Sequence, residues 1–250
     1  MSEAGAIAVS DDTLLGGRVR LRQPVDGYRV AVDPVLLAAA VDAKPGQRVL
    51  DAGCGTGAAL LCLAARVPSI DVTGLEIQTE LARLAEENVA LNGLNSRARI
   101  VTGDLGALPD LICAYPFDIV LTNPPYVAAG TPPPDPSVAV AHRETNLPLA
   151  GWIARCLALL KPNGRFVMIH RADRTTEILA ALAPKCGDVR IRPIHGKSGQ
   201  PATRVIIDAG LGRKSPDTVL SAFILHRADG AFTDEADAVL RHGGRLPGQA

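Results

Sequence analysis

The chain has 250 residues and zero formal net charge, with 47% hydrophobic and 21% charged residues. This length allows one large α/β domain, or a domain with a small extension. No apolar run reaches the roughly 18–20 residues that a membrane span requires. The N-terminus lacks the basic start and apolar centre of a signal peptide, so we expect a cytoplasmic protein.

The cysteines are scattered, without a C-x-x-C pair and without clustered histidines. They are Cys54, Cys62, Cys113, Cys156 and Cys186. This spacing predicts neither disulfides nor a zinc site, and it favours a reducing compartment.

The charges are unevenly spread. Residues 51–150 contain 5 basic and 11 acidic residues, whereas residues 151–250 contain 15 basic and 9 acidic ones. The basic part is compatible with a polyanionic partner, although blocks of this size are also typical of a solvated surface.

The first 45 residues suggest a separate extension. The segment Leu14–Leu21 alternates apolar and basic side chains, as a half-exposed strand or hairpin does. We expect Asp33 to cap a helix that has Pro34 at its first position and continues to Val41.

From residue 47 onward, short apolar strands alternate with amphipathic helices. The expected strands are 48–51, 71–76, 99–102, 117–122, 165–170, 189–194 and 203–208, and the expected helices are 58–66, 79–91, 147–160 and 175–182. Such alternation predicts a mostly parallel sheet with helices on both faces, and the last two strands form an antiparallel addition. We therefore divide the chain into an extension (1–45), an α/β domain (46–210) and a C-terminal appendage (211–250).

The first of these strands ends in a glycine-rich turn, Asp51-Ala52-Gly53-Cys54-Gly55-Thr56-Gly57. Its G-x-G-x-G spacing differs from the G-x-G-x-x-G of dinucleotide-binding folds. Glycine permits a tight turn from strand to helix and the close approach of a ligand. The turn therefore predicts a cofactor loop.

Two further acids end the next two strands. Glu76 lies 19 residues beyond Gly57, where an acid can accept hydrogen bonds from both ribose hydroxyls of an adenosine ligand. Asp104 follows the third strand at the same edge and can accept from an adenine amino group. Each acid alone can equally be a helix cap or a loop residue, but three acids at successive strand ends favour a nucleoside site.

Asn123-Pro124-Pro125-Tyr126 follows the apolar strand 117–122. The Asn123 side-chain oxygen and the Pro124 carbonyl can each accept a hydrogen of a planar amino group and orient its lone pair for attack on a methyl donor. Tyr126 offers a ring on which a flat base or amide can stack. Taken alone, the motif could also be a turn.

These two motifs resemble those of the class I S-adenosylmethionine-dependent methyltransferases, over about residues 45–170. The resemblance implies a Rossmann-like fold with a seven-stranded mixed sheet and S-adenosylmethionine as cofactor. The implied cofactor-binding residues are Asp51, Gly53, Gly55, Gly57, Glu76, Ile77, Asp104, Leu105 and Asn123, and the implied catalytic residues are Asn123, Pro124, Pro125 and Tyr126. A nicotinamide dehydrogenase is the competing interpretation, but its fingerprint is not matched.

The Asn-Pro-Pro-Tyr motif is similar to that of enzymes that methylate adenine N6, guanine N2 or protein glutamine. The pattern from Gln23 to Ala38 is similar to the N-terminal signature of bacterial tRNA(Val) (adenine-N6)-methyltransferases. Further likeness lies in Arg143-Glu144, Pro201–Val205 and His226-x-x-Asp229-Gly230. This resemblance implies an RNA partner, namely tRNA, and an extension that lies over the cofactor site. The alternatives are a protein-glutamine methyltransferase and a non-catalytic cofactor-binding scaffold or RNA-binding module.

Several residues have a role only through this resemblance. Gln23 and Asp33 would line the site, and capping or loop packing is the alternative for both. The basic side chains Arg190, Arg192, Lys197 and Arg204 could contact phosphates, and each could equally be a solvated surface residue. The proline-rich loop 131–136 could be a lid or a passive linker.

Overall fold

The computed structural model describes residues 8–26, 29–125 and 147–248. Its strands are β1 (Val9–Leu14), β2 (Val19–Pro24), β3 (Arg48–Ala52), β4 (Asp71–Glu76), β5 (Ala98–Thr102), β6 (Phe117–Thr122), β7 (Leu160–Arg171), β8 (Cys186–Lys197), β9 (Ala202–Leu211), β10 (Thr218–Val219) and β11 (Phe223–His226). Its helices are η1 (Leu15–Gly17), α1 (Asp33–Ala40), α2 (Ala58–Arg66), α3 (Thr79–Leu91), α4 (Asp110–Cys113), α6 (Leu149–Ala158), η2 (Ala172–Arg174), α7 (Thr175–Leu182) and α8 (Asp234–Leu240). None of the helices in these ranges is long and apolar enough to cross a membrane.

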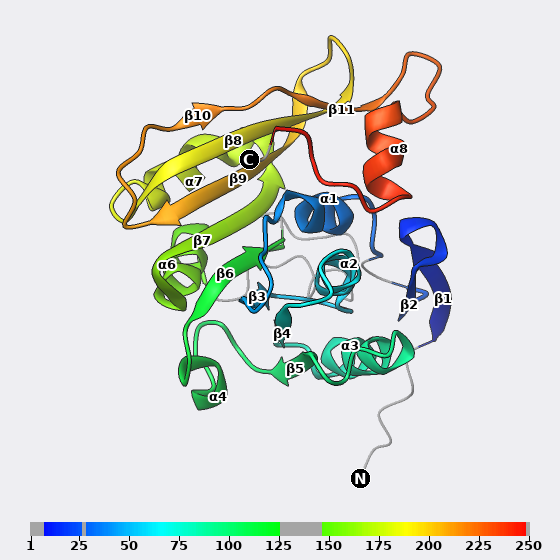
Figure 1. The fold of residues 1–250 in the computed structure, drawn as a ribbon, viewed down its shortest axis with the longest axis vertical. Coiled ribbons are helices and arrows are strands. Elements are labelled where there is room, and N and C mark those ends of the chain that lie inside the picture. The colour runs from blue at the N-terminus through cyan, green and yellow to red at the C-terminus, as the bar shows by residue number, and fades with distance from the viewer. Residues whose placement is uncertain (1–7, 27–28, 126–146, 249–250) are drawn as a thin grey trace.

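The main sheet has the order β10-β8-β9-β7-β6-β3-β4-β5, and β11 also pairs with β8. In Figure 1 these strands follow one another from β5 at the bottom to β10 at the top. The strands from β5 to β7 are parallel, and β9 lies antiparallel between β7 and β8. The predicted α/β class and the antiparallel addition are confirmed.

The sheet contains nine strands in the described residues, rather than the seven predicted. The two additional strands, β10 and β11, come from the C-terminal appendage and pair in parallel with β8. They were missed because they have only 2 and 4 residues, too few for a periodic pattern to be visible.

Two hydrophobic cores cover the two faces of the sheet. Because side chains alternate across a strand, Val49 and Ile119 point to the core under α1, α2 and α3, whereas Leu50 and Val120 point to the core under α6 and α7. The strands are therefore buried on both sides, as the continuous apolar run Phe117–Thr122 predicted.

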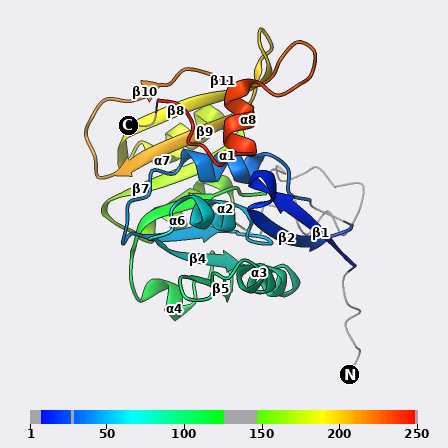
Figure 2. The ribbon, with the colours of Figure 1, turned by 45° about the vertical axis from the view of Figure 1, so that its right-hand side comes forward.

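The two chain ends pack against the first of these cores. Leu21 of β2 and Val239 of α8 both belong to it. Arg18 donates from Nη2 to the His242 carbonyl (3.0 Å), which joins the two ends directly. Figure 2 shows the β1–β2 hairpin beside α3 and close to α8. The boundaries at 45/46 and 210/211 remain predictions.

Asp33 does not cap α1, contrary to the prediction. Val32 is the capping residue, and no side chain accepts a capping hydrogen bond there. Asp33 is instead the first residue of the helix, and its Oδ2 accepts from Arg204 Nε of β9 (2.8 Å). The nearby cation across the fold offers this carboxylate a stronger partner than a backbone amide.

Candidate active site

The edge formed by the carboxyl ends of β5, β4, β3 and β6 brings the predicted site residues together. Ala52 pairs with Leu75 on one side and with Thr122 on the other. Glu76 follows Leu75, and Asn123 follows Thr122. Both therefore lie beside Gly53, the residue after Ala52. On the far side Glu76 pairs with Thr102, two residues before Asp104.

The glycine loop has the backbone conformation that its sequence predicted. Gly53, Gly55 and Gly57 have φ values of 74°, 56° and 86°, a region that side chains with a Cβ rarely adopt. The amides of Gly53 and Cys54 both donate to the Leu75 carbonyl, at 2.8 and 3.0 Å. The loop is thereby fixed to β4 before α2 begins.

The Glu76 side chain holds the glycine loop by hydrogen bonds to backbone amides. Its Oε2 accepts from the Gly55 amide (2.8 Å) and its Oε1 accepts from the Gln78 amide (2.9 Å). The residue is only 5% exposed. Burial raises the pKa of Glu76, and the backbone amides of Gln78, Gly55 and Ile77 oppose that shift.

Asp51 is the second buried acid, at 3% exposure. Burial raises the pKa of Asp51 to about 7, and the negative charge of Glu76 adds to this shift. The Leu60 amide, which donates to Asp51 Oδ2 at 3.2 Å, opposes the shift. An acid with this pKa gains or loses its charge near neutrality. A cation bound beside it would favour the ionised form.

The three other residues predicted to contact the cofactor are the half-buried Asp104, the exposed Ile77 and the buried Leu105. Asp104 Oδ1 accepts from the Gly106 amide (2.7 Å). Ile77 is 43% exposed, so its side chain is available to an apolar ligand surface. Leu105 is 4% exposed and packs in the core under α6 and α7, so its side chain contributes to the scaffold.

Asn123 and the two prolines lie at the end of β6. Pro124 is buried, whereas Asn123 and Pro125 are half-buried. Tyr126 and the loop 131–136 lie outside the described residues, as do Arg143 and Glu144.

A buried hydrogen-bond chain that the sequence did not reveal ties β6 to the glycine loop. Thr122 Oγ1 donates to the Ala52 carbonyl (2.7 Å) and accepts from Trp152 Nε1 of α6 (3.0 Å). The Trp152 ring also covers Gly53, where an added Cβ would lie 3.1 Å from two ring carbons. The only signal in the sequence was that Trp152 is the single tryptophan and follows the proline-rich loop.

The N-terminal hairpin reaches the same loop through Asn88 of α3. Asn88 Nδ2 donates to the Arg22 carbonyl (2.8 Å) and to the Thr56 carbonyl (3.0 Å), and Asn88 is fully buried. Gln23 is 4% exposed and holds its own loop: Nε2 donates to Asp12 Oδ2 (2.9 Å), and Oε1 accepts from the Val30 amide (2.8 Å). Gln23 thus has the loop-packing role that was its alternative interpretation.

Arg192 is not available to a phosphate. It is 2% exposed, and its guanidinium donates to the carbonyls of Ser221 (2.9 Å) and Pro247. It therefore ties the C-terminal segment to β8. Arg204 pairs with Asp33, and Lys197 donates to the Ala228 carbonyl (3.2 Å), but neither is buried.

No group of three or more histidine, cysteine or carboxylate side chains in the described parts of the chain could hold a metal ion. The described site consists of glycine backbone, buried acids and an amide side chain. A mostly parallel sheet of this order, with a glycine loop after β3 and acids at the ends of the next two strands, defines a Rossmann-like fold, a class in which ligands bind at the carboxyl edge of the strands.

Comparison with known proteins identifies the family within this fold class. A family model described as a methyltransferase domain matches residues 43–209. A tRNA1(Val) (adenine(37)-N6)-methyltransferase from Aeromonas hydrophila is 30% identical over 208 residues, 82% of this chain and 86% of the relative. One from Porphyromonas gingivalis is 32% identical over 219 residues, 83% and 85% of the two chains.

Two solved structures have the same fold. A protein from Agrobacterium tumefaciens, described as a predicted O-methyltransferase, superposes with a TM-score of 0.69 and 27% identity, covering 86% of this chain and 97% of that one. A SAM-dependent O-methyltransferase from Thermotoga maritima has a TM-score of 0.53 at 22% identity, covering 76% and 68%, which shows the fold alone. The chain belongs to the S-adenosylmethionine-dependent methyltransferase family, among relatives named tRNA1(Val) (adenine(37)-N6)-methyltransferases.

Proposed function

We propose that the glycine loop and the acids beside it bind S-adenosylmethionine. Gly53, Gly55 and Gly57 would leave room for its methionine part, and Glu76 would accept from the ribose hydroxyls. Asp104 would accept from the adenine amino group. Ile77 would lie against the adenine ring, and the buried Leu105 would support the ring from the core. Bound there, S-adenosylmethionine supplies an electrophilic methyl group on a sulfonium.

Three features of this edge support that fit. A Cβ built on Gly55 would meet no atom of the described residues within 4 Å, so these residues leave open space over the loop. The Thr56 hydroxyl is buried and has no hydrogen-bond partner among the described residues. The two buried acids Asp51 and Glu76 suit a ligand that carries a sulfonium and an ammonium group, because a cation beside them favours their ionised forms.

We further propose that the methyl acceptor is an exocyclic amino nitrogen, and that it is N6 of an adenine in tRNA. The observation that carries this proposal is the position of Asn123, directly beyond Thr122 and beside Gly53. Asn123 Oδ1 and the Pro124 carbonyl would accept the two amino hydrogens, which orients the nitrogen lone pair toward the methyl group. The same two dipoles stabilise the positive charge that develops on the nitrogen during transfer.

The end of β6, which precedes Asn123, is held rigidly by buried hydrogen bonds. Thr122 is fully buried and is held between the Ala52 carbonyl and Trp152 Nε1, so the residue before Asn123 cannot shift independently of the glycine loop. Tyr126 would stack on the base. An amino group attached to a ring is acidic enough after methylation that no strong general base is required.

The choice of tRNA rests on the names of relatives that match more than four fifths of this chain. The last hundred residues, with 15 basic and 9 acidic side chains, are compatible with an RNA backbone. An adenine in a loop is accessible without the unpairing that a duplex base would require.

The test is methyl transfer from labelled S-adenosylmethionine to three substrates: unmodified tRNA, ribosomal RNA and a peptide-chain release factor. The RNA is digested to nucleosides, and the protein to peptides, before mass spectrometry. The proposal predicts N6-methyladenosine in tRNA. Methylglutamine in the protein would overturn the RNA substrate, and ribose 2′-O-methylation would overturn the amino acceptor.

A further inference from the structure

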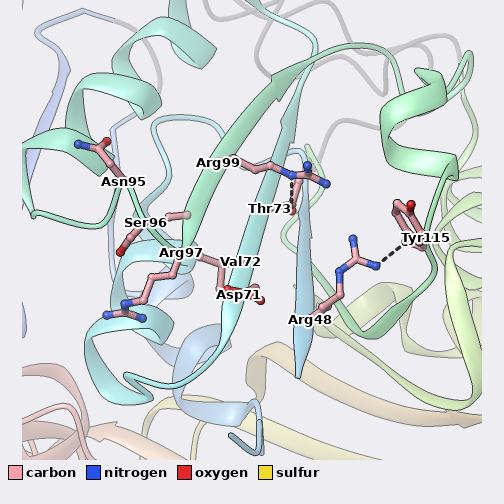
Figure 3. Close-up of a pocket in the computed structure, with 10 residues that line it drawn as sticks. Arg48, Asp71, Val72, Thr73, Asn95, Ser96, Arg97, Arg99 and Tyr115 are labelled. Atoms are coloured by element: carbon pink, nitrogen blue, oxygen red, sulfur yellow. Dashed lines mark hydrogen bonds between the residues drawn. The ribbon is translucent and has the colours of Figure 1, made fainter. Parts of the chain in front are cut away.

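A pocket lies at the edge of the sheet opposite the candidate active site, at the amino ends of β3, β4 and β5. It has a volume of about 420 Å³. Its lining includes three arginines, Arg48, Arg97 and Arg99, together with the ring of Tyr115 (Figure 3). The five residues of β3 separate it from the glycine loop, a distance of about 17 Å at the rise of a strand. It is therefore distinct from the candidate active site.

The pocket exists because this part of the sheet is thinly covered. The connection between β5 and β6 contains the four-residue helix α4, whereas the next connection toward the C-terminus contains the ten-residue helix α6. Tyr115, just after α4, is 67% exposed, and Arg99 of β5 is exposed as well.

Two guanidinium groups converge on the opening. Figure 3 shows Arg99 and Arg48 reaching toward the same space beside Tyr115. Arg99 Nε donates to Thr73 Oγ1 (3.2 Å), and its two terminal nitrogens have no partner among the described residues. These nitrogens are the donors that a phosphate accepts in a bidentate manner.

Arg48 is held in place for this role. Its Nη1 donates to the carbonyls of Tyr115 (3.0 Å) and Pro116 (3.1 Å). Its guanidinium carbon lies 4.8 Å from the Phe117 ring centroid and 5.6 Å from that of Tyr115. The cation therefore stays at the mouth of the pocket.

The rest of the lining suits a nucleoside better than a bare anion. Asp71 is exposed and forms no ion pair with any described residue, and Asn95 and Ser96 line the same pocket. A carboxylate and an amide can bind hydroxyl or amino groups, and an exposed aromatic ring can stack on a base. Cations, hydrogen-bonding groups and a ring are thus combined in one cavity.

We propose that this pocket binds one phosphorylated nucleoside unit of the RNA substrate, with Arg99 and Arg48 on its phosphate and Tyr115 against its base. The proposal rests on the proposed function, because it takes the RNA as the source of that unit. The RNA would then contact the protein at both edges of the sheet, at the catalytic edge and about 17 Å away from it.

The test compares three pocket variants and one control variant in binding to an unmodified tRNA transcript by fluorescence anisotropy over a range of salt concentrations. Arg99→Gln is expected to raise the Kd about fivefold and to reduce the salt dependence by about one phosphate contact. Tyr115→Ala is expected to weaken binding about fivefold or more, and Tyr115→Phe, which keeps the ring, to bind like the wild type. Arg241→Gln, at the residue that follows α8, is the control that removes one exposed charge, paired with Asp237, far from the pocket.

S-adenosylmethionine affinity and thermal unfolding of each variant establish that the fold and the active site are intact. Equal tRNA affinity of Arg99→Gln and Arg241→Gln would overturn the proposal. So would saturable binding of free adenosine or guanosine monophosphate that Arg99→Gln abolishes while tRNA binding is unchanged, since the unit would then be a free nucleotide. If tRNA binding depends on Arg99 but no methyl transfer occurs, the pocket is supported and the proposed function fails. If methyl transfer to tRNA occurs but the Kd for tRNA does not depend on Arg99, the proposed function is supported and the pocket proposal fails.

Discussion

Replacing Gly53 with alanine tests how tightly the glycine loop is enclosed. At φ 74° an alanine is strained by about 1–2 kcal/mol. Its Cβ would also lie 3.1 Å from two ring carbons of Trp152, which is 6% exposed and hydrogen-bonded, so the ring has little freedom to move. Such overpacking costs a further 1–3 kcal/mol or so, which gives about 2–5 kcal/mol in total.

Gly46 provides the matched control. It has a φ of 79°, and within the part of the chain that the structure describes a Cβ there would meet no atom within 4 Å, so Gly46→Ala should cost only the strain, about 1–2 kcal/mol. Urea unfolding of both variants is followed by the fluorescence of Trp152, the single tryptophan. If the two substitutions reduce the free energy of unfolding equally, the enclosure of Gly53 by Trp152 is refuted.

Three further predictions concern the buried groups of the site. Because the pKa of Asp51 is raised to about 7, its carboxyl is protonated in the folded chain and ionised in the unfolded chain between about pH 4 and 7, so its contribution to stability falls as the pH rises through that window. The free energy of unfolding of Asp51→Asn relative to wild type should therefore rise by about 1.4 kcal/mol per pH unit there, and an unchanged difference in urea titrations would contradict this. Glu76→Gln should weaken S-adenosylmethionine binding at least about tenfold in calorimetry, because it removes a charged acceptor, whereas Glu86→Gln on the exposed side of α3 should not. Thr122→Val should lower both stability, by about 1–3 kcal/mol, and kcat, because it leaves Trp152 Nε1 buried without a partner; wild-type kinetics would show that this chain does not position Asn123.

The sequence was sufficient where a single periodic pattern decides the structure. The predicted bounds of α2, α3, β4, β6 and α7 agree with the structure. These elements are either apolar strands buried on two faces or helices ended by turn formers, and both signals are local.

The prediction failed where tertiary contacts decide. The helix predicted over 147–160 ends earlier, at Ala158, and the turn formers Lys161–Gly164 that follow it lie within β7, which begins at Leu160. Asn163 adopts a φ of 63°, and the pairing of β6 with β7 shifts register between Phe117 and Ile119. Turn-forming residues thus make an irregularity inside a strand, which no local pattern distinguishes from a helix stop.

The site was predicted in the same uneven way. Strand ends and motif order sufficed to bring Glu76, Gly53 and Asn123 to one edge. The roles of Trp152 and Asn88 depend on which helix packs over which loop, and this information is spread over the whole chain. Arg192 was misjudged as accessible because burial by the C-terminal segment has no signature at the residue itself.

The most direct test of the central claim is single-turnover methyl transfer to unmodified tRNA by the wild type and by Asn123→Ala, both saturated with S-adenosylmethionine. If Asn123 orients the amino group of an adenine, the variant should form N6-methyladenosine at least about a hundredfold more slowly, with its cofactor affinity nearly unchanged. Formation of N6-methyladenosine at the wild-type rate, or an equal loss of rate and cofactor affinity, would contradict the account.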